Sequence, residues 1–240
     1  MKIICVVPVY NEENRLVNLI KKIKKYKKKQ KIDFIFFDNG STDKSRAILI
    51  KEKQKYIQKK RNMGIGYALI EGLKYSLKKK YDIVIYIAGN GKMLPNQIQR
   101  FLNKLKDKKI DYVNGSRFLP GGNSSTNPFF RKISIKIISQ IIEFFFSKKI
   151  TDATCGFRGF KTKIFNKGKI KFFCKKELYT YGFEYYFYGK ILVSNIASAE
   201  VPVDMNYPKK GSYSKIRPII DWYTMIKFWF VALFDSKKIF

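Results

Sequence analysis

The chain has 240 residues, which is enough for one substantial hydrophobic core, and we expect one domain. Apolar residues make up 45% of the sequence, which excludes a disordered chain. The formal net charge is +32, but only 8 of the 50 basic residues are arginine, so part of the charge reflects a bias toward A/T-rich codons and carries no function. There is no histidine, which excludes the usual general base and the commonest metal ligand.

The first 115 residues alternate short apolar runs with amphipathic helical patterns. Strands are predicted at residues 2–7, 33–37, 56–57, 83–87 and 112–114, and a helix follows each of the first four. This alternation predicts an α/β fold with a mostly parallel sheet and helices on both faces. Because the chain enters its first strand at once, we expect no signal peptide. The cysteines at positions 5, 155 and 174 lack metal-like spacing and fit a reducing compartment.

The stretch from Asp82 to Ile98 is predicted to lie at the centre of the sheet. The apolar run Ile83–Ile87 predicts a strand that is buried on both faces, and the chain then breaks at Ala88–Gly91. Open α/β sheets bind their ligands beyond the carboxyl ends of such strands. The loop here carries one charge, that of Lys92, and no carboxylate.

Two later segments are strongly apolar. Residues 128–147 gather Phe and Ile side chains on one helical face, and residues 219–234 are more apolar still, although Asp221 and Lys227 interrupt them. A bilayer requires roughly 20 apolar residues, so we expect no full transmembrane span. Both segments suit helices that lie in a membrane interface, and the alternative is that they cap the sheet. We therefore predict a domain over residues 1–215, including the helix at 128–147, and a membrane-interface segment over residues 216–240.

Seven short motifs follow one another along nearly the whole chain. They are VPVYNEE (7–13), DNGSTD (38–43), NMGIGYA (62–68), GSR (115–117), DATCGFR (152–158), EVPV (200–203) and SYSK (212–215). Together they resemble the family 2 glycosyltransferases of the GT-A fold, and within that family the dolichyl- and polyprenyl-phosphate sugar transferases. The resemblance implies a Rossmann-like GT-A sheet, amphipathic membrane-interface helices and a nucleotide-sugar donor.

The resemblance assigns the donor to the ends of the first strands. The residues that would hold the nucleoside are Pro8, Tyr10, Glu12 and Asp38. A carboxylate suits this position because it accepts charge-assisted hydrogen bonds from a base N–H and from ribose hydroxyls. Asn39 stands where many members have a second Asp, and it is assigned to the same site. Turn formation and helix capping are the alternative roles for Asp38 and Asp43.

The acceptor and a closing loop are assigned in the same way. The residues that would bind the acceptor phosphate are Arg117, Arg131 and Ser134. Guanidinium groups suit phosphate because of their forked geometry, and a surface salt bridge is the alternative role for the two arginines. Asp152 would lie near the reacting centre, where the family keeps an acid. The loop that closes over the donor would contribute Lys209, Lys210 and Lys215, with a lysine in place of the usual arginine.

The family usually carries Asp-x-Asp after the central strand, where the two acids bind Mg²⁺ or Mn²⁺ on the donor diphosphate. This chain has Ala88 and Asn90 at those positions, with Lys92 two residues further on. Hard cations require anionic oxygen ligands, and Asn90 alone is a poor set. In one hypothesis, Lys92 takes the place of the metal, and catalysis is metal-independent. In the other, the protein binds a nucleotide-sugar without transferring it. Retention of the other motifs favours the first.

We therefore predict an inverting glycosyltransferase that moves a hexose from a nucleotide-sugar to a polyprenyl phosphate, peripherally at the cytoplasmic face of a membrane. Catalysis would rest on Asp152, Arg117 and Lys92. A phosphate acceptor is largely ionised at neutral pH and requires no base. A glycan hydroxyl acceptor is the alternative, with Asp152 or Glu184 as base. Nucleic acid is not expected as a partner, because no aromatic-basic motif accompanies the charge.

Overall fold

The structure is a computed structural model that describes residues 1–123, 128–165, 176–205, 207 and 220–235. Within these residues, the strands are β1 (Ile3–Val9), β2 (Asp33–Asp38), β3 (Tyr56–Gln58), β4 (Ile83–Tyr86), β5 (Tyr112–Ser116), β6 (Arg158–Lys161) and β7 (Ser198–Pro202). They form a seven-stranded sheet in the order β3-β2-β1-β4-β6-β5-β7. The strand β6 runs antiparallel to β4 and β5, and the other neighbouring strands are parallel. The predicted α/β fold with a mostly parallel sheet is confirmed.

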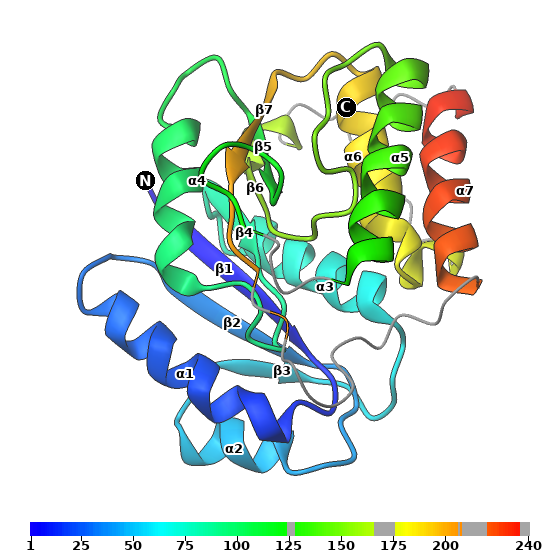
Figure 1. The fold of residues 1–240 in the computed structure, drawn as a ribbon. Helices are drawn as coiled ribbons and strands as arrows, with labels where there is room; N and C mark the ends of the chain where they lie inside the picture. Colours follow the sequence, from blue (N-terminus) through cyan, green and yellow to red (C-terminus); the bar gives the residue numbers. More distant parts are fainter. Residues whose placement is uncertain (124–127, 166–175, 206, 208–219, 236–240) are drawn as a thin grey trace.

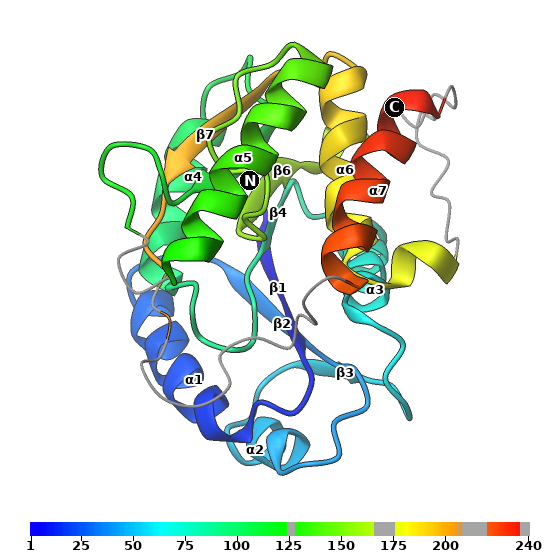
Figure 2. The same cartoon turned by 45° about the vertical axis from the view of Figure 1, so that its right-hand side comes forward.

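Helices cover both faces of the sheet, as Figures 1 and 2 show. The helices of one face are α1 (Glu13–Lys27), α2 (Ser45–Lys51) and α4 (Ile98–Leu105). Those of the other face are α3 (Ile65–Lys78), α5 (Phe129–Phe146), α6 (Gly182–Val193) and α7 (Ile220–Phe234). Short 3₁₀ turns lie at Pro95–Gln97, Thr162–Ile164 and Lys176–Tyr179. The sheet is therefore the middle layer of three.

The central strands β1 and β4 are buried on both faces, as their uninterrupted apolar runs predict. The helix α1 buries Leu16, Leu19, Ile20 and Ile23, which recur at helical spacing, against one face. Because parallel strands end at a common edge, the loops after β1, β2 and β4 meet there. The thiols of Cys5 and Cys155 are buried and free, and Cys174 lies outside the described residues.

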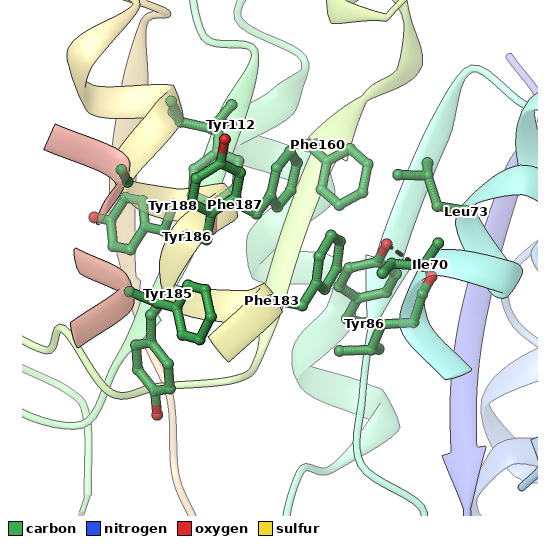
Figure 3. Close-up of a cluster of buried hydrophobic side chains, with 14 of the residues drawn as sticks. Ile70, Leu73, Tyr86, Tyr112, Phe160, Phe183, Tyr185, Tyr186, Phe187 and Tyr188 are labelled. Carbon is green, nitrogen blue, oxygen red and sulfur yellow. Dashed lines mark hydrogen bonds between the residues drawn. The ribbon is translucent and has the colours of Figure 1, made fainter. Parts of the chain in front are cut away.

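The helix α6 forms the core of the opposite face with aromatic side chains (Figure 3). The rings of Phe187 and Phe160 meet edge to face with centroids 5.1 Å apart, and those of Tyr112 and Tyr188 stack at 5.0 Å. Such pairs contribute roughly 0.5–1.5 kcal/mol beyond their burial. No expectation covered α6, because a helix that is apolar all round lacks the one-sided pattern of a surface helix.

The helix α7 packs closely along α6. A Cβ at Gly189 would lie 2.6 Å from the Cβ of Ala232, so this close approach requires glycine. Trp229 is fully buried between the two helices and the end of α5, where its ring meets that of Phe146. The helix within the predicted segment 216–240 is thus part of the core on one side, and the domain boundary at residue 215 stays a prediction.

The outer faces of α5 and α7 carry exposed large apolar side chains. On α5 these are Phe129, Phe130, Ile133, Ile137, Ile141, Phe144 and Phe145, and on α7 they are Trp222, Tyr223, Ile226 and Phe234. The buried side of α5 instead includes Ser139, whose hydroxyl accepts a hydrogen bond from the Ala153 N–H. The core therefore does not use the most apolar face of α5. None of the described helices has both the length and the apolar character needed to cross a membrane.

Candidate functional site

Side-chain hydrogen bonds tie the loops after β1 and β2 together at the carboxyl edge of the sheet. Asn11 accepts a hydrogen bond from the Thr42 N–H at 2.8 Å, and Asp43 accepts one from the Glu13 N–H at 3.0 Å. The other carboxylate oxygen of Asp43 accepts a hydrogen bond from the Ser45 N–H at the start of α2. Asp43 therefore caps the start of α2 and holds the two loops together. This is the turn and capping role that the sequence analysis gave as its alternative.

Asp38, the last residue of β2, differs from Asp43 in having one oxygen to spare. Its side chain is fully buried, and Oδ1 accepts a hydrogen bond from the Ser41 N–H at 3.0 Å. Its Oδ2 is also buried and has no hydrogen-bond partner among the described residues. A buried polar atom without a partner costs about 1–3 kcal/mol. The geometry therefore leaves Oδ2 ready to accept a hydrogen bond from a ligand.

The amide of Asn39 is engaged with the protein. It donates to the Asn62 side chain and to the Gly64 carbonyl, both at 2.9 Å, and it accepts the Met63 N–H at 3.2 Å. Asn39 therefore anchors the loop before α3 beneath the carboxyl edge. Its contact with a nucleotide stays a prediction, and the amide explains why an asparagine fits here where an acid would lack the two N–H donors.

The other residues predicted to bind the nucleotide-sugar also lie at the carboxyl edge of the sheet. The Pro8 carbonyl accepts a hydrogen bond from the Gly89 N–H at 3.1 Å, which fixes the loop after β4 against β1. A Cβ at Gly89 would lie 2.5 Å from that carbonyl oxygen, so this contact requires glycine. Tyr10 is half-buried. Glu12 precedes α1, its N–H donates to the Ser45 hydroxyl at 2.7 Å, and its carboxylate lies 3.7 Å from Arg15.

The loop after β4 folds back on itself. The carbonyl oxygen of the Asn90 side chain accepts a hydrogen bond from the Lys92 N–H at 3.1 Å, and the Ala88 N–H contacts the sulfur of Met93 at 3.2 Å. Lys92 is only 9% exposed. Burial lowers the pKa of Lys92 to about 8, and the nearby cations Arg131, Arg15 and Arg117 lower it further against the opposing effect of Glu12. Such a concentration of positive charge is typical of an anion site.

Tyr207 lies among these cations, and no sequence motif singled it out. Its ring centroid is 5.1 Å from Nζ of Lys92 and 5.7 Å from Cζ of Arg131. Its hydroxyl accepts a hydrogen bond of 2.6 Å from Arg117. A lone tyrosine gives no signal in one sequence, because its significance comes only from what packs around it.

Arg117 and Asp152 form a buried bidentate ion pair. Nε and one terminal nitrogen of Arg117 donate to the two carboxylate oxygens of Asp152 at 2.7 and 2.8 Å. Arg117 also donates hydrogen bonds to the hydroxyls of Thr154 and Tyr207. The N–H and the hydroxyl of Thr154 both donate to Asp152. The carboxylate of Asp152 is fully buried. Asp152 holds Arg117 in place and raises the pKa of its guanidinium, against the opposing effect of burial.

This ion pair bears on two predictions. Both oxygens of Asp152 accept hydrogen bonds from protein donors, which argues against the alternative in which Asp152 acts as the base for a glycan hydroxyl. Arg117 is 4% exposed, and most of its guanidinium N–H groups donate hydrogen bonds to protein atoms. This arrangement argues against direct binding of a phosphate by Arg117. In the structure, Asp152 holds the guanidinium of Arg117 beside the Tyr207 hydroxyl, and the catalytic roles of both residues stay predictions.

Arg131 and Ser134 lie at a groove between α5, α6 and α7. The apolar residues that line the groove are Ile135, Ile138, Tyr185, Trp222, Met225, Ile226 and Trp229, and the polar ones are Arg131, Ser134 and Thr154. The Ser134 hydroxyl donates to the Phe130 carbonyl at 2.9 Å. The groove therefore combines an aliphatic and aromatic wall with a guanidinium group, in contact with the exposed apolar faces of α5 and α7.

Glu184, at the start of α6, is the half-buried acid that the sequence named as an alternative base. Burial raises its pKa, and Arg158 lowers it to a smaller extent. A Cβ at Gly156 would lie 2.7 Å from its Oε1 and 3.5 Å from Cε of Met93, so the carboxylate lies near the residue that follows Lys92. The predicted closing-loop residues Lys209, Lys210 and Lys215 lie outside the described residues.

Comparison with known proteins decides the family. The family model described as glycosyl transferase family 2 matches residues 4–168. The chain belongs to glycosyl transferase family 2. The predicted resemblance is thereby confirmed, and the protein is a glycosyltransferase.

Relatives of this glycosyltransferase are distant. The polyprenol monophosphomannose synthase of Mycolicibacterium smegmatis is 23% identical over 168 residues, which span 68% of this chain and 62% of that protein. The undecaprenyl-phosphate mannosyltransferase of Micrococcus luteus is 25% identical over 167 residues, or 67% of each. Glucosyl-3-phosphoglycerate synthase from Mycobacterium tuberculosis has a TM-score of 0.68 at 17% identity, over 97% of this chain and 78% of that one. The last likeness confirms the GT-A fold.

The divalent ion that the family's acidic motif implies does not fit this glycosyltransferase. Ala88 offers no ligand atom, and the side-chain oxygen of Asn90 already accepts a backbone N–H. Lys92 lies two residues further on, and its electrostatic neighbours are three guanidinium groups and one carboxylate, that of Glu12, so the local charge is mainly positive and opposes a cation. Among the described residues, no three His, Cys, Asp or Glu side chains are placed to hold a metal ion.

Proposed function

We propose that this glycosyltransferase moves a hexose from a nucleotide-sugar to a polyprenyl phosphate, with inversion and without a metal ion. The observation that carries the proposal is the adjacency of two features: a buried cationic cluster after β4, and a groove whose apolar wall ends at Arg131. A polyprenyl phosphate has the same two parts, an anionic head and an apolar chain. The two curated relatives carry polyprenol or undecaprenyl phosphate in their names, which supports this acceptor.

The donor would lie along the carboxyl edge of β1, β2 and β4. The unpartnered Oδ2 of Asp38 would accept a hydrogen bond from the nucleoside, with Pro8, Tyr10 and Glu12 around it. The diphosphate would lie at Ala88–Lys92. An ammonium about 4 Å from a phosphate oxygen contributes roughly 4 kcal/mol at an effective dielectric constant of 20. Lys92 can therefore stabilise the leaving diphosphate in place of a metal.

The acceptor would approach from the membrane. Its isoprenoid chain would lie in the groove between α5 and α7, and its phosphate would lie at Arg131 and Ser134. The exposed apolar side chains of α5 and α7 would enter the lipid interface. Each basic residue near an anionic membrane adds about 1 kcal/mol of attraction, and the chain carries a net charge of +32. We therefore place the glycosyltransferase peripherally at the cytoplasmic face.

The transfer is a single displacement. An acceptor phosphate oxygen forms a bond to the anomeric carbon from the face opposite the leaving group. The bond between that carbon and the diphosphate oxygen breaks, and its electron pair leaves with the nucleoside diphosphate. No proton has to be removed from the acceptor, because its second pKa is near 6 and it is largely a dianion at neutral pH. A chain without histidine and with a fully occupied Asp152 is suited to this reaction.

The test is a panel of nucleotide-sugars offered with undecaprenyl phosphate, with and without EDTA, followed by mass spectrometry of the lipid product. We expect one donor to give a lipid-linked monosaccharide and the rate to be the same in EDTA. Loss of turnover in EDTA and its return with Mn²⁺ would contradict the role of Lys92. Nucleotide binding without turnover for any acceptor would indicate a binding subunit.

A glycan hydroxyl as acceptor is the second candidate, and Glu184 is the observation that favours it. A hydroxyl must lose a proton, and the raised pKa of this half-buried carboxyl suits a general base. In that case Glu184→Gln abolishes transfer to a glycan. If the acceptor is a lipid phosphate, Glu184→Gln keeps most of the activity.

A further inference from the structure

Tyr207 contacts three cationic side chains of the site. It is 5% exposed. Its ring centroid lies 5.1 Å from Nζ of Lys92 and 5.7 Å from Cζ of Arg131, and its hydroxyl accepts a hydrogen bond from Arg117 at 2.6 Å. The Tyr207 hydroxyl also lies 3.7 Å from the sulfur of Met205, and this contact helps to hold the Tyr207 side chain in place.

The three cations reach Tyr207 from separate parts of the fold. Lys92 lies in the loop after β4, Arg117 directly follows β5, and Arg131 lies in the first turn of α5. In the proposed function, Lys92 serves the donor diphosphate and Arg131 serves the acceptor phosphate. The ring of Tyr207 is therefore the group that the donor and acceptor cations share.

The aromatic ring offsets the repulsion between these like charges. The negative faces of an aromatic ring attract cations, and most strongly when burial removes water. Without the ring, Lys92 and Arg131 would relax away from each other toward solvent. Arg117, clamped on Asp152, fixes where the ring lies through its hydroxyl.

We propose that Tyr207 is a positioning residue that holds Lys92 and Arg131 at the separation at which the donor diphosphate and the acceptor phosphate can react. The inference rests on the proposed function for the identity of the two anions. The chemical step needs two anions close together, and paired cations on one ring lower the repulsion between them. The site is thus built before either substrate binds.

The variants separate the ring from the hydroxyl. Tyr207→Phe keeps the ring and loses the hydrogen bond to Arg117, and Tyr207→Leu loses both. Tyr75→Leu is the matched control, because its ring also lies near a lysine, 5.4 Å from Nζ of Lys55, and neither residue is assigned to the site. Thermal unfolding of each variant reports whether it is folded.

The first readout is binding of inorganic pyrophosphate by calorimetry in EDTA at pH 7. We expect Tyr207→Leu to weaken binding by about tenfold or more, Tyr207→Phe by about threefold or less, and Tyr75→Leu to bind like the wild type. Equal binding by wild type and Tyr207→Leu overturns the inference. Equal losses in the Phe and Leu variants overturn the part given to the ring.

The second readout is the NMR signal of the Lys92 side chain, which needs no ligand. The ring shifts the methylene protons beside Nζ upfield in the wild type and in Tyr207→Phe. A Lys92→Met spectrum assigns the signal, and absence of the shift in the wild type overturns the inference even if Tyr207→Leu does not fold. The charged groups that also face Lys92 are Glu12, Arg15, Arg117 and Arg131, and they are unchanged between the variants.

Transfer kinetics then separate this inference from the proposed function. If the wild type transfers sugar to polyprenyl phosphate, Tyr207→Leu should raise KM for both substrates and lower kcat, whereas a purely structural defect would lower only the active fraction. If the wild type transfers nothing, the proposed function fails. Pyrophosphate binding and the Lys92 signal still decide the role of Tyr207.

Discussion

At the carboxyl ends of β1 and β2, acidic side chains accept hydrogen bonds mainly from backbone N–H groups, whereas Asp152, next to the end of β5, also forms a bidentate ion pair with a guanidinium group. Asp43 exemplifies the first region, and the pair of Arg117 and Asp152 the second. Glu200 extends the hydrogen bonds of the second region, since its carboxylate accepts a hydrogen bond from the Thr151 hydroxyl at 2.6 Å.

The difference has consequences for what each region can do. Several hydrogen bonds from backbone N–H groups join the two loops of the first region, so no single contact carries the whole arrangement, and Oδ2 of Asp38 is left for a ligand. A buried ion pair makes the second region dependent on both of its partners, because either charge alone is costly to bury.

The largest expected effect comes from breaking that ion pair. Arg117→Ala leaves the fully buried carboxylate of Asp152 without its partner and should cost about 3–5 kcal/mol of unfolding free energy. Urea unfolding measures it. The control is Arg100→Ala, whose ion pair with Asp204 is 3.5 Å long and more exposed, and which should cost about 0–1 kcal/mol. Equal losses in the two variants would show that the pair of Arg117 and Asp152 carries no special weight.

The next effect concerns the charge of Lys92. Lys92→Met should lower turnover by about 100-fold or more, since an ammonium near a phosphate contributes roughly 4 kcal/mol. Lys92→Arg should keep far more activity than Arg117→Ala does. Steady-state rates at saturating donor measure both, and comparable losses in Lys92→Arg and Arg117→Ala would argue against these roles.

The pH dependence sharpens the same point. Because the pKa of Lys92 is about 8 in the folded chain, pyrophosphate binding should weaken as pH rises above about 8, and Lys92→Arg should remove that decline. The folded state also holds fewer protons than the unfolded chain between about pH 8 and 10.5, so the stability contributed by Lys92 rises with pH across this window. Lys92→Met should abolish that rise in urea titrations, and a flat wild-type profile would contradict it.

Asp38 at the end of β2 and Asp43 in the loop that follows should respond in different ways to substitution by asparagine. Asp38→Asn keeps an oxygen for the Ser41 N–H and should weaken nucleotide binding by about 10- to 100-fold, because a hydrogen bond to a charged group contributes about 1.5–3 kcal/mol. Asp43→Asn should instead lower unfolding free energy by about 1 kcal/mol, with binding nearly unchanged. Calorimetry and urea unfolding test both, and a parallel loss in the two variants would contradict the distinction.

The smallest effect on stability should come from the exposed face of α5. Phe130→Ser combined with Ile137→Ser removes apolar side chains that are 83% and 50% exposed, so unfolding free energy should change by about 0.5 kcal/mol or less. Sedimentation with anionic vesicles should show reduced binding. Ile50→Ser, on α2 and 54% exposed, is the control and should bind as the wild type does. Unchanged binding in the double variant would remove α5 from the membrane interface.

The sequence by itself determined the elements whose pattern is local. The strands β1 to β5 begin and end within two residues of their predicted bounds, and the helices predicted at 128–147 and 219–234 are present as α5 and α7. It also located the residues beyond β1, β2 and β4, because parallel strands carry their following loops to one edge. The strands β6 and β7 were missed, because Arg158–Lys161 has no apolar run and the alternation in Ser198–Pro202 is short, with a small apolar residue and a proline in it.

Only the tertiary structure determined which charged residues contact one another. Arg117 and Asp152 are 35 positions apart, and Tyr207 lies 90 positions from Arg117. These contacts exist because β6 enters the sheet antiparallel between β4 and β5, and because β7 then pairs with β5. Residue type and spacing cannot encode a contact of that range, since it depends on which strands become neighbours. The sequence therefore assigned Lys92 to the sugar donor and Arg117 and Arg131 to the acceptor phosphate. The packing brings all three to one tyrosine, Lys92 and Arg131 at its ring and Arg117 at its hydroxyl.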